Sequence, residues 1–311
     1  MAPATSSDDG LAVPIDPDAR RGAGVRLGIS LGGGGLYFIA WQVAYLDELA
    51  SAGIDVAGAD RLVGTSAGSV VSSMLAAGSL GRLHTAARLL AKVPRVVAAM
   101  APAGALSPSQ TRALELFGAA RTADPDKVRE IGHAALAAGG PPPGRMARAL
   151  TVVMGRRSWP SPALQLTCVD AFTGERCVMT ADSGVPLPRA AAASSAVPGL
   201  FAPQPVRDRR CMDGGVSGTG THLDLLAGAR RAFVLSLTDG SMVGEGGMTV
   251  APGAVEADLE ALRSSGTEVW MRCPAPVDID QLMSPAAVSE ALTAGRAAAR
   301  RDTTELRSFL A

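Results

Sequence analysis

The stretch that most constrains the fold is residues 25–79, where two strand-like apolar runs alternate with two helix-like runs. The first run, 25–31, ends in glycines, and 36–53 repeats its apolar residues at helical spacing. A second strand pattern, 61–66, runs into a sharp turn and then into 67–79, a helix-like run of small residues. Such units build parallel sheets covered by helices, so we predict an α/β fold.

The following segment, 80–160, is rich in alanine, arginine, leucine and proline. Helical patterns near 81–93, 108–120 and 125–138 predict a helical cap inserted between the halves of the sheet. Strand patterns return beyond it with a hairpin around Gly174, and the chain ends in a helix-like pattern.

Composition limits the classes of function. Lys+Arg and Asp+Glu balance at 29 each and aromatic residues make up 4%, so no nucleic-acid partner is predicted. None of the four cysteines forms a CxxC pair, so we predict no metal and no redox centre. Cys168 and Cys177, which could face each other across the hairpin, are expected to be buried thiols.

The first 24 residues contain no apolar stretch typical of a secretory signal, and no run of 18 apolar residues occurs in the chain. We therefore expect a disordered leader over residues 1–24, no transmembrane helix, and a cytoplasmic location.

The pentapeptide GTSAG lies at the second strand-to-helix turn, with Ser66 at its centre. In a G-x-S-x-G turn the serine hydroxyl is held exposed, and the flanking Gly64 and Gly68 relieve crowding. The helix that follows directs N–H groups toward any negative charge that develops there. Ser66 is therefore a candidate nucleophile, although a tight strand-to-helix connection alone would also explain the five residues.

A serine nucleophile needs a base, and the sequence has three histidines: His84, His133 and His222. The first two fall in the expected cap. The order Ser66, Asp213, His222 imitates an α/β-hydrolase triad, but nine residues of one glycine-rich loop leave little room for that geometry. We therefore favour Asp213 itself, followed by Gly214 and Gly215, although a turn would also explain an isolated aspartate.

Four glycines, Gly32 to Gly35, join the first strand to the first helix. A P-loop requires a lysine after its last glycine, and Leu36, Tyr37 and Phe38 follow here. A dinucleotide loop requires a glycine at position 37 or 38. Both phosphate-binding interpretations fail, which leaves a cradle of backbone N–H groups suited to an oxyanion.

In combination these motifs resemble those of the patatin-like phospholipases, or lipid acyl hydrolases. The glycine-rich turn, GTSAG one βαβ unit later, ASSAVPGLFAP at 193–203 and DGG at 213–215 carry the resemblance. The segment LQLTCVDAFTGE at 164–175 also resembles the strand and turn that precede the third motif. The resemblance covers roughly residues 25–240. It implies a three-layer fold with a mostly parallel central sheet covered by helices, in a catalytic domain over 25–311.

The resemblance also implies a Ser–Asp dyad without histidine. Ser66 would attack the ester, and Asp213 would take its proton directly. Partial burial is expected to raise the pKa of Asp213 modestly above the usual ~3.9. The expected oxyanion donors are the backbone N–H groups of Gly33, Gly34 and Ala67.

The sequence departs from the family pattern directly after the glycine motif. In the family, the glycines that correspond to Gly32 to Gly34 are usually followed by x-[RK]-G, whereas this sequence has Gly35, Leu36 and Tyr37. Without the basic residue, the sequence does not say which contacts hold the loop in place. The loss of this charge also favours a neutral ester over a phosphate-bearing substrate.

The activity implied is hydrolysis of a lipid or carboxylic ester through an acyl-enzyme, with no cofactor. A lipid or acyl ester is then the expected partner, and peripheral membrane contact and the oligomeric state stay open. Two alternatives remain: an acyltransferase with the same nucleophile, or a decayed site that binds lipid or a protein.

Two further features have competing interpretations. Phe38, Trp41 and Tyr45 could line an acyl pocket, but core packing is the preferred interpretation. The segment 93–108 could be a lipid-facing lid, and ordinary packing explains it equally well, since three prolines interrupt any regular helix.

Overall fold

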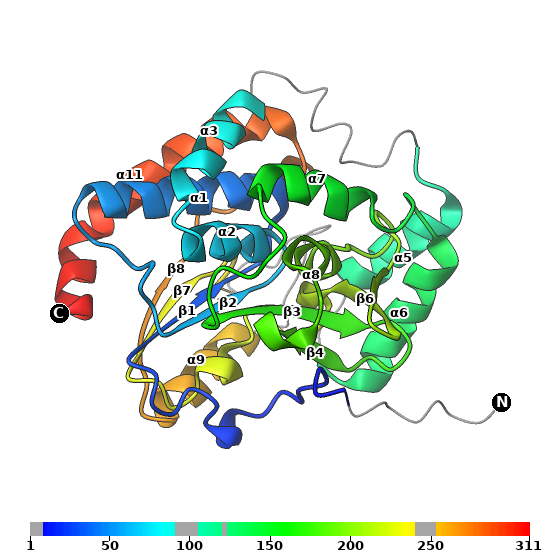
Figure 1. Cartoon of the computed structure of the whole chain (residues 1–311), viewed down its shortest axis with the longest axis horizontal. Coiled ribbons are helices and arrows are strands. Elements are labelled where there is room, and N and C mark those ends of the chain that lie inside the picture. The colour runs from blue at the N-terminus through cyan, green and yellow to red at the C-terminus, as the bar shows by residue number, and fades with distance from the viewer. Residues whose placement is uncertain (1–8, 91–104, 120–122, 240–252) are drawn as a thin grey trace.

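The computed structural model describes residues 9–90, 105–119, 123–239 and 253–311. Its centre is an eight-stranded sheet of order β5-β6-β3-β2-β1-β7-β8, with β4 paired to β3 (Figure 1). The strands are β1 (Leu27–Leu31), β2 (Arg61–Gly64), β3 (Leu164–Asp170), β4 (Arg176–Met179), β5 (Gln204–Val206), β6 (Arg209–Asp213), β7 (Arg231–Leu235) and β8 (Glu268–Arg272).

Most of the sheet is parallel. The neighbours β3, β2, β1, β7 and β8 all pair in parallel. Antiparallel pairing occurs at one end, where β4 and β6 pair with β3 and β5 pairs with β6. The prediction of a mostly parallel sheet is confirmed.

Helices cover both faces of this sheet, as the predicted three-layer fold requires (Figure 1). Side chains alternate along each strand, so that Phe233 packs toward one helical layer and Val234 toward the other. The first layer contains α1 (Gly35–Ser51), α2 (Ala67–Ala76), α3 (Leu80–Leu90), α7 (Arg145–Met154), α8 (Leu187–Ser194) and α11 (Val288–Leu310). The second contains α5 (Pro108–Gly118), α6 (Pro125–Ala138) and α9 (Ala254–Ser264).

The segment expected to form a helical cap is divided between the layers. Its helices α3 and α7 join the layer of α1 and α2, whereas α5 and α6 pack on the opposite face over Val169 and Met212. The segment 93–108, interpreted as a lid or as packing, lies outside the described residues except for its last four positions.

Aromatic side chains of α1 form part of the core. The rings of Trp41 and Tyr45 stack 4.9 Å apart, and Tyr45 also contacts Phe233 and Trp270. Phe38, Trp41 and Tyr45 are all buried and none of them lines the cavity described below, so the preferred interpretation of these rings as core is confirmed. No helix among the described residues is both long and apolar enough to cross a membrane.

Within the segment expected to be a disordered leader, residues 11–13 instead pack along the sheet. Leu11 is buried in the main core, and Ala12 forms a bridge with Cys177 of β4. The Val13 N–H donates to the Arg176 carbonyl at 2.9 Å, and the Val178 N–H donates to the Leu11 carbonyl at 2.9 Å. These residues therefore cover the edge of β4, which satisfies its backbone groups.

Candidate active site

Ser66 lies in a sharp turn between β2 and α2. Its backbone has φ +52° and ψ −117°, a conformation that costs about 1–3 kcal/mol in a non-glycine residue and is concentrated at functional sites. The Ser66 N–H donates to the Ser194 hydroxyl at 2.9 Å. Ser194 belongs to the ASSAVPGLFAP motif, so that motif anchors the backbone of the candidate nucleophile.

The glycines that flank the turn permit close packing of α2. A β-carbon added to Gly68 would lie 1.8 Å from the Leu31 carbonyl oxygen, and one added to Gly64 would lie 2.2 Å from the Ser72 hydroxyl. Larger residues would therefore push the helix, with its N–H groups, away from Ser66.

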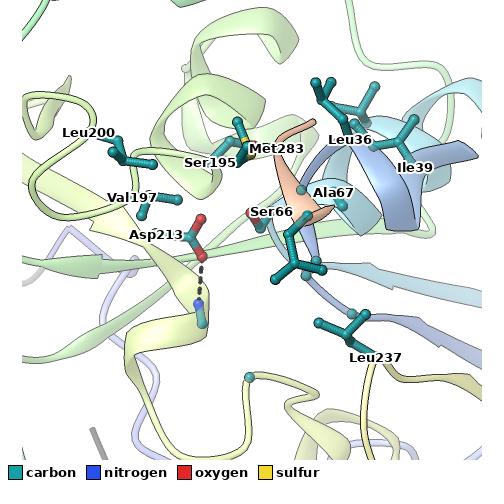
Figure 2. A pocket seen from close by; sticks show the side chains of 18 of the residues that line it. Leu36, Ile39, Ser66, Ala67, Ser195, Val197, Leu200, Asp213, Leu237 and Met283 are labelled. Carbon is teal, nitrogen blue, oxygen red and sulfur yellow. Dashed lines mark hydrogen bonds between the residues drawn. The ribbon is translucent and has the colours of Figure 1, made fainter. Parts of the chain in front are cut away.

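Asp213 ends β6 and is 1% exposed. Its Oδ1 accepts a hydrogen bond from the Gly215 N–H at 2.8 Å, whereas its Oδ2 is buried with no partner among the described residues. Figure 2 shows the carboxylate facing the Ser66 hydroxyl across the pocket. Burial raises the pKa of Asp213 to about 6, against the opposing effects of Ser66 and the Gly215 N–H.

The glycine run lies directly beside Ser66. A β-carbon added to Gly33 would lie 3.1 Å from the Ser66 β-carbon, and one added to Gly34, at φ +154°, would meet Phe38 at 2.6 Å. Among the described residues, the N–H groups of Gly33, Gly34 and Ala67 have no hydrogen-bond acceptor. The structure thus places Gly33 against Ser66, and Gly33, Gly34 and Ala67 all line one cavity with it.

Backbone contacts and one amide side chain brace the glycine run. The Gly32 N–H donates to the Leu235 carbonyl at 2.9 Å. The Gly32 carbonyl accepts from the Gly68 N–H and from Nε2 of Gln42, each at 3.0 Å. Sequence reasoning missed Gln42, although a polar residue about two helical turns beyond the motif, on a helix of mostly apolar residues, was a usable signal.

The departure from the family pattern faces the same pocket. Gly35 has φ +63°, and a β-carbon there would lie 2.5 Å from the Leu282 carbonyl oxygen of α10 (Ile279–Leu282). Leu36, where the family carries a cation, lines the pocket, and Tyr37 is buried. An apolar side chain therefore stands in the lining of the pocket where the family pattern has a charge.

A cavity of about 470 Å³ opens above Ser66 and Asp213. Apolar side chains form most of its lining, and among its described lining residues only Asp213 and Asp280 carry an acidic or basic side chain. The Ser195 hydroxyl lines the cavity and has no partner among the described residues. Figure 2 draws part of this lining: Leu36, Ile39, Val197, Leu200, Leu237 and Met283.

His222 does not contact the Asp213 carboxylate. Its Nε2 lies 3.1 Å from the Gly214 carbonyl oxygen, and its Nδ1 lies 3.4 Å from a guanidinium nitrogen of Arg176. Burial and Arg176 lower the pKa of His222 to about 3, so the imidazole is neutral in the physiological range. This geometry does not form the hydrolase triad that the residue order imitates.

The other two histidines lie away from the cavity. His84 of α3 pairs through Nδ1 with the Asp47 carboxylate at 2.7 Å, and His133 of α6 is exposed. Neither belongs to the described lining of the cavity, which leaves Asp213 as the base candidate nearest Ser66.

Three cysteines form the one group among the described residues whose ligand atoms could hold a metal ion. The thiols of Cys168, Cys177 and Cys211 lie within 4.8 Å of one another on three adjacent strands, and all three are buried. Cys168 and Cys177 are direct cross-strand partners, as the hairpin interpretation allowed. Cys168 is also the cross-strand partner of Asp213, so the thiol cluster packs beside the strand end that carries the candidate base.

Comparison with known proteins gives one family match. The model of the family described as patatin-like phospholipase matches residues 29–223, which span every motif of the candidate site. A search of curated proteins gives no match.

Among solved structures, the crystal structure of the type III effector protein ExoU matches with a TM-score of 0.36 and 17% sequence identity. The match covers 89% of this chain and 53% of that one, so the chain spans about half the length of ExoU.

Proposed function

Since the chain belongs to the patatin-like phospholipase family, we propose that it is a lipid acyl hydrolase that cleaves carboxylic esters with a Ser66–Asp213 dyad. One observation carries the proposal: the buried, unpartnered Oδ2 of Asp213 faces the Ser66 hydroxyl across the apolar cavity (Figure 2). A carboxylate in that position can accept the serine proton directly.

In the first half of the reaction, Asp213 takes the Ser66 proton while the oxygen attacks the ester carbonyl. With a pKa of about 6, Asp213 is ionised at pH 7 and is a stronger base than an ordinary aspartate. The N–H groups of Gly33, Gly34 and Ala67 stabilise the oxyanion. One such donor typically contributes about 10²–10³-fold to kcat.

In the second half, the protonated Asp213 gives its proton to the departing alcohol. An acyl group then remains on Ser66. Asp213, again ionised, takes a proton from a water molecule that attacks the acyl carbonyl, and returns this proton to the Ser66 oxygen as the carboxylic acid departs. If the acceptor is another hydroxyl group instead of water, the same dyad performs acyl transfer, and product analysis with added alcohols separates the two outcomes.

A fluorophosphonate probe tests whether Ser66 is a working nucleophile. We expect the intact protein to be labelled at Ser66, because the probe needs an activated serine and an oxyanion site. Mass spectrometry of the labelled peptide reports the position. Ser194→Ala is unsuitable as a control, because the Ser194 hydroxyl anchors the Ser66 N–H. Ser289→Ala on α11 is the control, and it should be labelled like the native protein. An unlabelled protein would favour the alternative of a decayed site that binds lipid.

The substrate class can be tested at Leu36. We expect the native protein to prefer neutral over anionic esters of equal chain length, because acidic groups are the only charges among the described lining residues. Leu36→Arg should raise the anionic-to-neutral ratio of kcat/KM by about fivefold, as a partly exposed ion pair contributes about 1 kcal/mol. Leu36→Met is the matched control, with an unchanged ratio. An anionic preference in the native protein would contradict this assignment.

A further inference from the structure

His222 is held in a conformation that a loop histidine does not adopt without support. It is 4% exposed and has φ +51°, in the left-handed region. A non-glycine residue there persists only where its surroundings determine it. The contacts that hold it are the Gly214 carbonyl on one side of the ring and Arg176 on the other.

These two contacts fix the tautomer of the ring. The Gly214 carbonyl can only accept a hydrogen bond, so Nε2 carries the proton. Arg176 can only donate, so Nδ1 presents its lone pair to the guanidinium. Arg176 is itself held by two bonds to the Asp224 carboxylate, of 2.5 and 2.7 Å, within the buried interior.

The Gly214 carbonyl shares one planar peptide unit with the Gly215 N–H. That N–H donates to Oδ1 of Asp213 at 2.8 Å. The Gly214 carbonyl also accepts the Ser217 N–H at 3.3 Å, and the His222 ring, at 3.1 Å, makes the shorter contact. His222 therefore helps to hold one end of a rigid peptide plane, and the candidate base is bonded to the other end. A rotation of this plane would withdraw the N–H from Asp213.

We propose that His222 is a positioning residue: it orients the Gly214–Gly215 peptide so that its N–H holds the Asp213 carboxylate toward Ser66. This inference rests on the proposed dyad chemistry. It assigns the histidine to orienting a peptide, whereas in a catalytic triad it would act as the base. Asp224 and Arg176 fix the ring, and the ring fixes the peptide. Gly214 suits this position because a β-carbon there would lie 2.6 Å from the Thr167 hydroxyl.

The Gly215–Asp213 hydrogen bond also affects the pH profile. The Gly215 N–H favours the ionised form of Asp213 and lowers its pKa against the effect of burial. Loss of that bond should raise the pKa of Asp213. The charged groups around His222 are Arg176 of β4, Asp224 beside it, and Asp258 of α9 across a shared cavity.

On the Asp213 side, the facing groups are the Ser66 hydroxyl and the uncharged thiol of Cys168 on the neighbouring strand β3. His222 stays neutral far below pH 7, so its own titration does not enter the profile.

The first test compares two substitutions of His222 in the full chain. His222→Gln can place an amide N–H near the position of Nε2 and should keep kcat close to that of the native protein. His222→Leu should lower kcat by about tenfold with little change in KM, and should move the acidic limb of kcat/KM to higher pH. His133→Leu, at an exposed site on α6, is the control and should change nothing. An unshifted limb and normal kcat in folded His222→Leu would overturn the proposal.

The second test reads the tautomer without any substrate. Long-range ¹H–¹⁵N spectra of the native protein should show His222 protonated at Nε2 alone and unchanged between about pH 5 and 8. A ring protonated at Nδ1, or one that titrates in this range, would overturn the inference. Should the native protein hydrolyse no ester and take no fluorophosphonate, the proposed function fails, while the tautomer is still decided by the spectra.

Discussion

Replacing Ser66 with alanine is expected to lower kcat for carboxylic esters by on the order of 10⁵-fold, to the level that binding and the oxyanion donors alone provide. The substitution removes only the oxygen that attacks the ester. The neighbouring N–H groups of Gly33, Gly34 and Ala67 keep their positions, because backbone contacts at Gly32 and Gly68 hold them. Steady-state kinetics on short-chain esters measures the loss.

The fold should survive this change. The Ser66 hydroxyl acts on the Asp213 carboxylate, whereas the main anchor of the residue, the N–H bond to Ser194, belongs to the backbone and is kept in alanine. We therefore expect the melting temperature of Ser66→Ala to match that of the native protein. Hydrolysis within tenfold of the native rate would show that another group is the nucleophile.

The sequence predicted the parts of the site that depend on local geometry. The strand-to-helix turn around Ser66 and the glycine run beside it lie at the ends of adjacent parallel strands, which the alternating pattern of 25–79 already implied. Asp213 comes from β6, an antiparallel strand far along the chain. Local pattern made it the favoured base but could not separate it from a turn aspartate, and the family resemblance supplied the connection with Ser66.

What the sequence did not predict depends on contacts between distant segments. The Ser194 hydroxyl acts on the backbone of Ser66, 128 residues earlier in the chain, and no spacing rule links the two. The helices α7 and α9 were missed although both bury apolar residues three and four positions apart, which was a usable signal. His222 was evaluated only as a base, because a role through a backbone carbonyl leaves no motif.

The second large effect is expected at Asp213. Asp213→Asn keeps an oxygen for the Gly215 N–H but cannot take a proton, so kcat should fall by about 10⁴-fold. In the native protein, kcat/KM should rise with pH and level off above about pH 6, since Asp213 must be ionised to act. A pH series on both proteins measures this, and the variant should lose that limb. A native profile flat between about pH 4 and 8 would exclude Asp213 as the base.

The same substitution should make the protein more stable at neutral pH. An unfolded Asp213 ionises near pH 3.8 and the folded one near pH 6, so above pH 6 burial of the charge opposes folding by about 3 kcal/mol. This cost disappears below about pH 4, where both states are protonated.

Asn carries no charge, so the free energy of unfolding of Asp213→Asn should exceed the native value at pH 7, and the difference should shrink as pH falls from 6 to 4. Denaturant titrations at these pH values measure it. If the charge of Asp213 were stabilised in the folded protein, the free energy of unfolding of Asp213→Asn would fall relative to the native value as pH rises from 4 to 7. That result would mean that Asp213 is not a desolvated base.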